Sequence, residues 1–564
     1  MTTKQFLVVV LAGLAVIVSC GGPDIVKEQT SPSVALTGRV SSEEEGPMEG
    51  VLVSAKRAGS TVTITVVSDA QGRYSFPRTK LEPGSYSLRI RAVGFELEGS
   101  GPVEVTAQET TQLDLKLRKA QDLAYQLSNG EWLLSMPGTE EQKRFLLERL
   151  GCVGCHTLER IVRTRYNAAE FKQVLLRMGT YFAGSSVLRP QKTKRSGRLM
   201  DPSREQQEEM AKQAEYLSTI NLSTASTWQY PLKTLPRPKG RGTRVIITEY
   251  DLPRPDTMPH DAVVDSEGMV WYSDFGNLFL GRLDPKTAKI VEYPVPVLRP
   301  GYPVGALELS LDREENVWLG LKEQAGVAKF DRKKEKFQTW DFPKNVDERL
   351  NMVASLYHHL DGMVWVGGRD EFRLDVRSGQ WIALDLYKDI PKDSPVAARR
   401  HSCYGIAADS QNNMWCMDFS SEYIGKVDAK TLKVNLYPTP TFDSAPRRGQ
   451  IDSQGRLWFA EYLGNKIGMI DTKNTNRGVQ EWAVPTPWTN PYDVVLDKNG
   501  DAWTGGMNTD RVMRLNTKTG EFIEYLLPRS TNIRRVDVDN STIPVTFWVG
   551  SNHGASIIKL EPLE

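Results

Sequence analysis

The chain has few cysteines, almost no net charge and no long apolar run beyond its N-terminus, and each shortage excludes a class of protein. Five cysteines in 564 residues are too few for a disulfide scaffold. The 71 lysines and arginines are balanced by 70 aspartates and glutamates. This balance argues against nucleic acid as a partner, because nucleic-acid binding depends on excess positive charge. At roughly 100–200 residues per domain, the length predicts three to five globular units.

The N-terminus has the pattern of a secretion signal. Lys4 precedes an apolar run over residues 6–18, which is too short to cross a bilayer. The run ends in Ile17-Val18-Ser19-Cys20-Gly21, which resembles a bacterial lipoprotein box with a lipidated cysteine. An ordinary secretory signal is the alternative. We expect a lipoprotein-type signal peptide over 1–20, a tether over 21–34, and an exported protein in the periplasm or outer membrane, membrane-bound by its lipid anchor only.

Residues 35–118 show the alternation of short, half-buried β-strands. Apolar and polar residues alternate between turns, which predicts a β-sandwich. The segments Asp69-x-x-Gly72-x-Tyr74-x-Phe76 and Leu81-x-Pro83-Gly84-x-Tyr86-x-Leu88 resemble the carboxypeptidase regulatory-like domain. The resemblance implies an accessory module without catalysis, so we expect a spacer or docking role.

A C-x-x-C-H sequence stands in the middle of the chain, as Cys152-Val153-Gly154-Cys155-His156. This spacing is the signature of covalent haem attachment, in which the histidine becomes the proximal iron ligand. Half of a zinc site is one alternative, but no further cysteine or histidine occurs between 157 and 259. A thioredoxin-like redox pair is another alternative, but such a pair would follow a β-strand, whereas this motif lies between segments with a helical period. We expect haem c on Cys152 and Cys155, with His156 bound to iron.

The residues around this motif have a helical period. A stripe of apolar side chains predicts a helix over 168–182, and Ser203 is a candidate N-cap for a helix that ends at Ile220. The sequence at 214–218 resembles the last helix of class I cytochromes. We therefore expect a small all-α cytochrome c-like domain over 119–226, followed by a linker over 227–243.

The sixth iron ligand is expected to be a methionine, because this region holds no second histidine. Met178 is favoured at a helix end, and Met200 on a basic loop is the alternative. Core packing is the structural alternative for Met178. The loop over 189–200 is either solvated or a docking patch for an acidic redox partner protein.

The second half of the chain is a repeat. Tryptophans recur at intervals near 45 residues, and five have an aspartate six positions earlier; the tryptophans are Trp271, Trp318, Trp365, Trp415, Trp458, Trp503 and Trp548. A second element, such as Ile247-Thr-Glu-Tyr-Asp-Leu-Pro253, also occurs seven times. The pattern predicts a seven-bladed β-propeller over 244–564. Because the first such element precedes the first tryptophan, residues 247–253 should supply the outer strand of the last blade.

Two repeat segments, Met258-Pro259-His260-Asp261 and Leu457-Trp458-Phe459-Ala460-Glu461, resemble those of the streptogramin (virginiamycin B) lyases. The resemblance implies a propeller that opens a cyclic depsipeptide by elimination with a divalent cation, usually Mg²⁺. It also implies a histidine and a glutamate at the mouth of one blade. Here His260 shares a blade with Asp274, and Glu461 shares one with Arg447. The candidate catalytic residues are therefore His260, Asp274 and Glu461.

Polar residues expected at this mouth could bind a metal, an acid or a substrate, or could form salt bridges between blades; they are His260, Asp274, Arg399, Arg400, His401, Asp418, Arg447, Arg448 and Glu461. Cys403 and Cys416 are expected to be two separate buried thiols.

The favoured function is an exported c-type haem protein that transfers electrons and binds a small molecule, peptide or glycan at its propeller. The alternatives are a metal-dependent, streptogramin lyase-like C–O lyase and a propeller that binds a surface glycan or protein.

Overall fold

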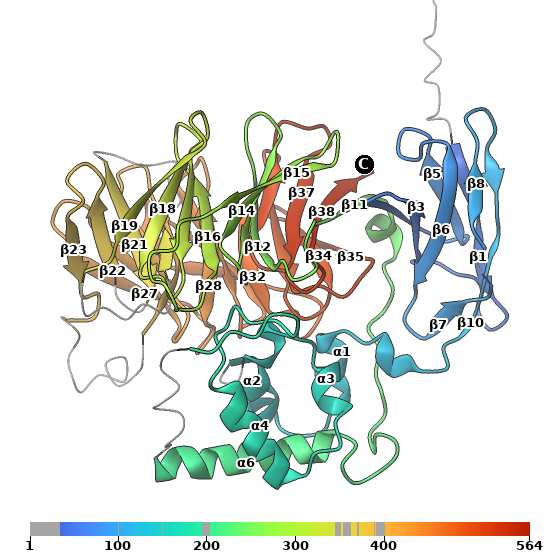
Figure 1. Ribbon diagram of the computed structural model, residues 1–564, viewed down its shortest axis with the longest axis horizontal. Coiled ribbons are helices and arrows are strands. Elements are labelled where there is room, and N and C mark those ends of the chain that lie inside the picture. Colours follow the sequence, from blue (N-terminus) through green and yellow to red (C-terminus); the bar gives the residue numbers. More distant parts are fainter. Residues whose placement is uncertain are drawn as a thin grey trace, which may run out of the picture.

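The computed structural model describes residues 34–99, 101–148, 151–193, 203–343, 351–353, 362–368, 371–388, 390 and 401–563. The predicted signal peptide, almost all of the tether, Met200, Arg399 and Arg400 lie outside these residues. The described residues form a mainly β molecule of three parts: an N-terminal sandwich, a helical segment and a ring of sheets (Figure 1).

The N-terminal part is the predicted β-sandwich. Its strands are β1 (Val34–Ser42), β2 (Gly46–Pro47), β3 (Leu52–Arg57), β4 (Val62–Val67), β5 (Arg73–Pro77), β6 (Gly84–Arg91), β7 (Phe95–Leu97), β8 (Val103–Val105), β9 (Thr111–Gln112) and β10 (Leu115–Lys119). Alternate residues such as Tyr74, Phe76 and Leu88 are buried in one core. The predicted period of two is therefore confirmed for these strands.

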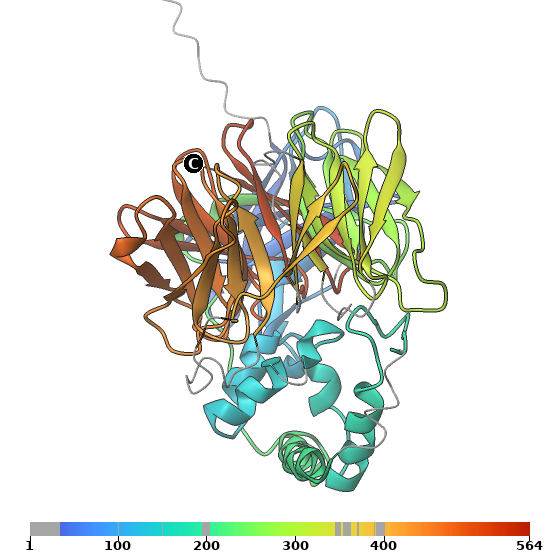
Figure 2. The same cartoon turned by 90° about the vertical axis from the view of Figure 1, so that its left-hand side faces the viewer.

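The middle part is helical. Its elements are η1 (Leu123–Tyr125), α1 (Asn129–Ser135), α2 (Glu140–Glu148), η2 (Cys152–Gly154), α3 (Glu159–Val162), α4 (Ala168–Met178) and α6 (Arg204–Ile220). Ser203 caps α6 in a capping box with Gln206, as predicted. Helix α4 ends at Met178, earlier than the predicted 182. In both views the helices lie against one side of the ring (Figures 1 and 2).

The C-terminal part is a ring of β-sheets. Its strands after the short η3 (Gly240–Thr243) are β11 (Val245–Asp251), β12 (Pro259–Val264), β13 (Val270–Asp274), β14 (Phe279–Asp284), β15 (Lys289–Pro294), β16 (Ala306–Leu311), β17 (Val317–Leu321), β18 (Gly326–Asp331), β19 (Lys336–Asp341), β20 (Asn351–Val353), β21 (Met363–Gly368), β22 (Glu371–Asp375), β23 (Trp381–Leu384), β24 (Cys403–Ala408), β25 (Met414–Asp418), β26 (Tyr423–Val427), β27 (Val434–Pro438), β28 (Pro446–Ile451), β29 (Arg456–Glu461), β30 (Lys466–Asp471), β31 (Val479–Ala483), β32 (Pro491–Leu496), β33 (Asp501–Gly506), β34 (Arg511–Asn516), β35 (Phe522–Leu526), β36 (Val536–Asp539), β37 (Thr546–Ser551) and β38 (Ser556–Pro562), with η4 (Thr475–Arg477) before β31.

These strands make seven blades among the described residues. Six are four-stranded sheets in chain order, from β12–β15 to β32–β35. The innermost strands contact their neighbours around a closed circle that ends with β36 against β12. In the seventh blade β11 pairs with β38, for example Thr248 with Lys559. The prediction that residues 247–253 supply the outer strand of the last blade is therefore confirmed.

The sandwich and the propeller share one sheet. Strand β4 pairs antiparallel with β11, so that the seventh blade continues into the sandwich as β36-β37-β38-β11-β4-β3-β6-β8. Ion pairs reinforce the junction: Lys56 lies 2.5 Å from Asp251, and Arg91 lies 2.7 Å from the buried Asp510. The outer edge of the last blade is thus covered by main-chain pairing.

The repeated tryptophans and aspartates have a structural role, because they bind each other within the blades. The indole Nε1 of Trp271 donates to Asp265 at 2.8 Å, and Trp503 donates to Asp497 at 2.9 Å. The same pair recurs at Trp318, Trp415 and Trp458. Each aspartate also accepts turn N–H groups, so it ties a buried ring to the adjacent hairpin.

A disulfide joins Cys403 to Cys416, so the prediction of two separate thiols is wrong. That prediction assumed a regular hairpin, which would hold the sulfurs out of reach. In the structure Cys403 pairs with Asp418, and the register shifts before Gly405 pairs with Met417. This β-bulge brings the two cysteine Cα atoms within 5.2 Å.

Candidate functional site

The C-x-x-C-H residues lie on η2 and the turn after it. Cys152 and Cys155 are free thiols and are half-buried. Burial raises the pKa of Cys152 to about 12, so it is protonated at neutral pH. The Nδ1 atom of His156 lies 2.9 Å from the Thr157 carbonyl oxygen. An Nδ1–H that donates to this carbonyl leaves Nε2 with a lone pair, as a metal-ligating histidine requires.

Propeller residues cover the backbone of this loop. Asn532 Nδ2 donates to the Val153 carbonyl at 3.0 Å, and an Arg534 guanidinium nitrogen donates to the Gly154 carbonyl at 3.2 Å. Both ring nitrogens of His553, in the turn after β37, are buried without a hydrogen bond to a described residue. Burial, together with the nearby positive charge of Arg534, lowers the pKa of His553 to about 3. The sequence contains no local signal for this contact between remote segments.

Of the two candidate sixth ligands, only Met178 lies within the described residues. Met178 is the last residue of α4 and is 41% exposed, so core packing does not account for it. Met200 lies outside the described residues. Of the basic loop, Arg189 lies 3.9 Å from Asp256, and Lys192 forms a β-bridge with Tyr181.

His260 lies in a buried network at the centre of the propeller. Its Nδ1 is 2.5 Å from Asp261 Oδ1, and its Nε2 is 3.1 Å from the Tyr492 hydroxyl, which in turn contacts the Tyr404 hydroxyl. Burial lowers the pKa of His260 to about 3, although Asp261 raises it. The imidazole is therefore neutral at pH 7, and its two ring nitrogens face Asp261 and the Tyr492 hydroxyl.

A set of ion pairs between blades surrounds Asp261. Arg448 contacts Asp261 at 2.8 Å and Glu308 at 2.6 Å, and Arg535 contacts Glu308 at 2.5 Å. Burial raises the pKa of Glu308 to about 7, and the two arginines oppose this rise. For Arg448 the alternative of an inter-blade salt bridge is confirmed.

The other two candidate catalytic residues lie apart from this network. Asp274 accepts from Arg254 at 2.8 Å and from the Met258 and Gly276 N–H groups. Glu461 is fully buried, and burial together with the nearby Glu481 raises its pKa to about 9. No hydrogen bond joins His260, Asp274 and Glu461 to one another in the described part of the chain. His401 instead pairs with Asp418 at 2.5 Å.

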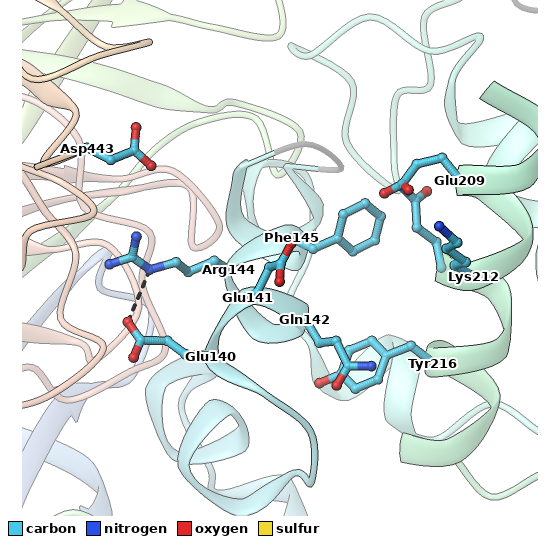
Figure 3. A pocket seen from close by; sticks show the side chains of 10 residues that line it. Glu140, Glu141, Gln142, Arg144, Phe145, Glu209, Lys212, Tyr216 and Asp443 are labelled. Carbon is cyan, nitrogen blue, oxygen red and sulfur yellow. Dashed lines mark hydrogen bonds and ion pairs between the residues drawn. The ribbon is translucent and has the colours of Figure 1, made fainter. Parts of the chain in front are cut away.

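A polar pocket of about 750 Å³ opens between α2 and α6 (Figure 3). Glutamates line it together with Phe145 and Tyr216, and Glu140 pairs with Arg144 at 3.2 Å across its rim. It contains none of the residues that the sequence predicts for haem or catalysis.

Within the described ranges no set of three or more His, Cys, Asp or Glu side chains is placed to hold a metal ion. In the same ranges no helix is long and apolar enough to cross a membrane.

Comparisons with known families match two parts of the chain. The virginiamycin B lyase family matches residues 391–561, and the carboxypeptidase regulatory-like domain matches residues 35–118. Neither match includes residues 119–243. The chain therefore combines an N-terminal carboxypeptidase regulatory-like domain with a lyase-like propeller.

Two solved structures are similar to the propeller half. A streptogramin B lyase is 23% identical, with a TM-score of 0.49, over 57% of this chain and 100% of its own. Virginiamycin B lyase from Staphylococcus aureus is 21% identical, with a TM-score of 0.47, over 56% of this chain and 99% of its own. A search of curated proteins gave no match.

Proposed function

We propose that the propeller binds a ligand at the mouth that faces the helical segment, and that this segment carries haem c and exchanges electrons there. The observation that carries the proposal is the free pair Cys152 and Cys155 beside a histidine whose Nδ1 faces a carbonyl. The lyase-like fold supports a binding or lyase role for the propeller. Haem attachment rests on the C-x-x-C-H residues, because neither family match covers them.

The residues present fit haem c. Two thiols without a disulfide can form the two thioether links, and His156 has a second ring nitrogen for iron. Met178 stands outside the core, and its sulfur would be the second protein ligand that holds the iron. Haem c would supply one-electron transfer. Asn532 and Arg534 would hold the loop against the propeller, so that the mouth and the attachment site form one region.

The test is to express the full chain with and without a c-type haem maturation system. We expect the matured protein to keep its visible absorbance through acid–acetone extraction. The Cys152→Ala/Cys155→Ala variant should lose it. The Cys403→Ala/Cys416→Ala variant is the matched control, because it removes two cysteines elsewhere and should stay coloured. Colour that washes out of the wild-type protein would refute covalent attachment.

A metal-dependent lyase is the second candidate, because the virginiamycin B lyase family matches residues 391–561. Elimination needs a base at the acidic C–H and a cation on the adjacent carbonyl. Here His260 is closed in by Asp261 and Tyr492, and Asp274 is occupied by Arg254. We therefore expect no streptogramin opening above background with Mg²⁺. Opening that is lost in both His260→Ala and Asp274→Asn would establish the lyase instead.

Export with lipidation at Cys20 completes the proposal. An acidic redox protein that docks near Arg189 and Lys192 would be the electron partner, because opposite charges steer such encounters. Globomycin, which blocks lipoprotein signal cleavage, should leave a larger precursor. A Cys20→Ser variant that still labels with palmitate would contradict this anchor.

A further inference from the structure

Adjacent arginines at the propeller centre have opposite surroundings. Arg448 and Arg535 pair with the carboxylates Asp261 and Glu308. Arg447 and Arg534 each stand one residue earlier in the chain and are 8% and 4% exposed. Neither has an ion pair with a described residue. Arg447 contacts aromatic rings and the Met507 sulfur, and Arg534 contacts Asn532 and the Gly154 carbonyl.

A third buried cation lies beside them. Lys322 follows the last residue of β17 and is 6% exposed. Its Nζ lies 4.7 Å from the Phe275 ring centroid and 5.1 Å from that of Phe182. No described carboxylate forms an ion pair with it. Burial lowers the pKa of Lys322 to about 8, which leaves it mostly protonated at pH 7.

Arg447 and Arg534 lie over one pair of tyrosines, and Lys322 shares the Phe275 ring with Arg534, whose guanidinium lies 5.7 Å from the ring centroid. The Arg447 guanidinium lies 4.9 Å from the Tyr404 ring and 4.0 Å from the Tyr492 ring, and Arg534 lies 5.3 Å from the latter. Burial raises the pKa of the Tyr404 hydroxyl, but the charges of Arg447, Arg534 and Lys322 outweigh it and hold the pKa below its ordinary value. The three positive charges therefore all act on the surroundings of the Tyr404 hydroxyl.

A buried charge without an ion-pair partner is energetically costly. An ion removed from water without a partner is strongly destabilised, and an aromatic face offsets only part of that cost. The Arg447 Nε–H is also buried without an acceptor in the described residues. We propose that Lys322, Arg447 and Arg534 form a binding site for a small anion, a carboxylate or an inorganic oxyanion, at the propeller mouth.

This inference deepens the proposed ligand-binding role by naming the class of ligand, but it does not depend on haem. The site touches the C-x-x-C-H loop through Arg534 and Gly154. The anion therefore has two conceivable sources: the carboxylates of a haem on that loop, or a free anion from solution. Both present the same chemistry to the three cations.

The first test is a titration with sodium formate on protein made without haem maturation. We expect the thermal midpoint of the wild type to rise saturably, because a ligand that binds only the folded state stabilises it. Lys322→Met and Arg534→Met should each weaken formate binding at least tenfold. Lys286→Met, which removes an exposed lysine on another loop, should behave as the wild type. No wild-type response up to 100 mM formate, or equal responses in all four proteins, would overturn the site.

The same titration on matured protein separates the two sources. If the formate response disappears only when haem is attached, the haem carboxylates occupy the site. If it persists, the occupant is a free anion. If no haem attaches, the two preparations are identical, and the formate result still decides on the anion site alone.

A second measurement needs no ligand. Lys322 and Lys329 lie in the same blade, but Lys329 pairs with the buried Asp312 at 3.0 Å. We expect Lys322→Met to raise the midpoint of the anion-free protein, because it removes an uncompensated charge, and Lys329→Met to lower it. A lower midpoint for both would show that Lys322 is already compensated and would contradict the proposal.

Discussion

Single buried side chains decide what the propeller centre can do. His260 is neutral because burial outweighs its aspartate neighbour, and its two nitrogens are already engaged by Asp261 and Tyr492. It is therefore held within a fixed network and is not a base that is open to substrate. Its lowered pKa also makes the folded state sensitive to acid.

The first prediction is that acid weakens the fold through His260. The folded-state pKa is about 3, below the ordinary 6.5, so the unfolded chain binds the proton first. The stabilisation is complete above pH 6.5 and is lost as the pH falls toward 3, at up to ~1.4 kcal/mol per pH unit. In denaturant titrations from pH 6.5 to 4, His260→Gln should show a shallower loss of unfolding free energy than the wild type. Parallel curves would contradict this role.

The second prediction concerns Met178. If its sulfur binds the iron of haem c, Met178→Ala should abolish the long-wavelength methionine–iron band and lower the reduction potential, because a methionine ligand raises it. Met210→Ala, on α6, is the control and should keep both. An unchanged spectrum and potential in Met178→Ala would shift the assignment to Met200.

Among the elements, β11 is the strand that joins the propeller to the sandwich. It pairs with β38 of the last blade on one side and with β4 of the sandwich on the other. The outer strand β15 of the first blade pairs only with β14 among the described strands. Loss of β11 therefore exposes two sheet edges at once.

The third prediction compares propeller fragments. A fragment that starts at residue 254 lacks β11 and leaves β38 as an open edge, whereas a fragment from 241 keeps the pair. We expect the shorter fragment to be insoluble or to melt at a clearly lower temperature, because it loses the β11 ladder and exposes β38, which is paired on both sides in the intact blade. Scanning calorimetry and sedimentation make the comparison. Equal midpoints and equal solubility would rule out closure by β11.

The repeat was visible in the sequence because each blade carries its own tryptophan. In five blades an aspartate of the adjacent turn binds that tryptophan within one hairpin. The capping box of α6 was visible for the same local reason. The disulfide was missed because a bulge beside Cys403 changes the pairing, and bulges have no strong sequence signal. The site of Lys322, Arg447 and Arg534 was predicted only in part. Arg447 was among the polar residues expected at the mouth, but Lys322 and Arg534 belong to other blades and come close to it only when the propeller closes.

At the scale of the whole molecule, the sandwich and the propeller are one sheet system. The pairing of β4 with β11 is supported by Arg91, which bonds Asp510 and the Leu527 and Arg529 carbonyls. Asp510 is almost fully buried, so loss of Arg91 would leave a buried carboxylate without its ion-pair partner. The two parts should therefore lose their structure together.

The fourth prediction tests this coupling. We expect the sandwich and propeller of the full chain to unfold in one calorimetric transition. Arg91→Met should lower its stability by about 3 kcal/mol, because it leaves a buried carboxylate unpaired. Arg89→Met, on the same strand but exposed, should change little. Two well-separated transitions in the wild type would refute the coupling.

The contact between the propeller and the C-x-x-C-H loop also has a consequence for the order of biogenesis. Val153 and its partner Asn532 are 379 residues apart. At 5–20 residues per second, a ribosome makes the second on the order of 20–80 s after the first. Throughout that interval the loop exists without Asn532, Arg534 or His553. An enzyme that modified the two thiols within this interval would meet a loop that the propeller does not yet cover. The synthesis of the last blade would end that interval.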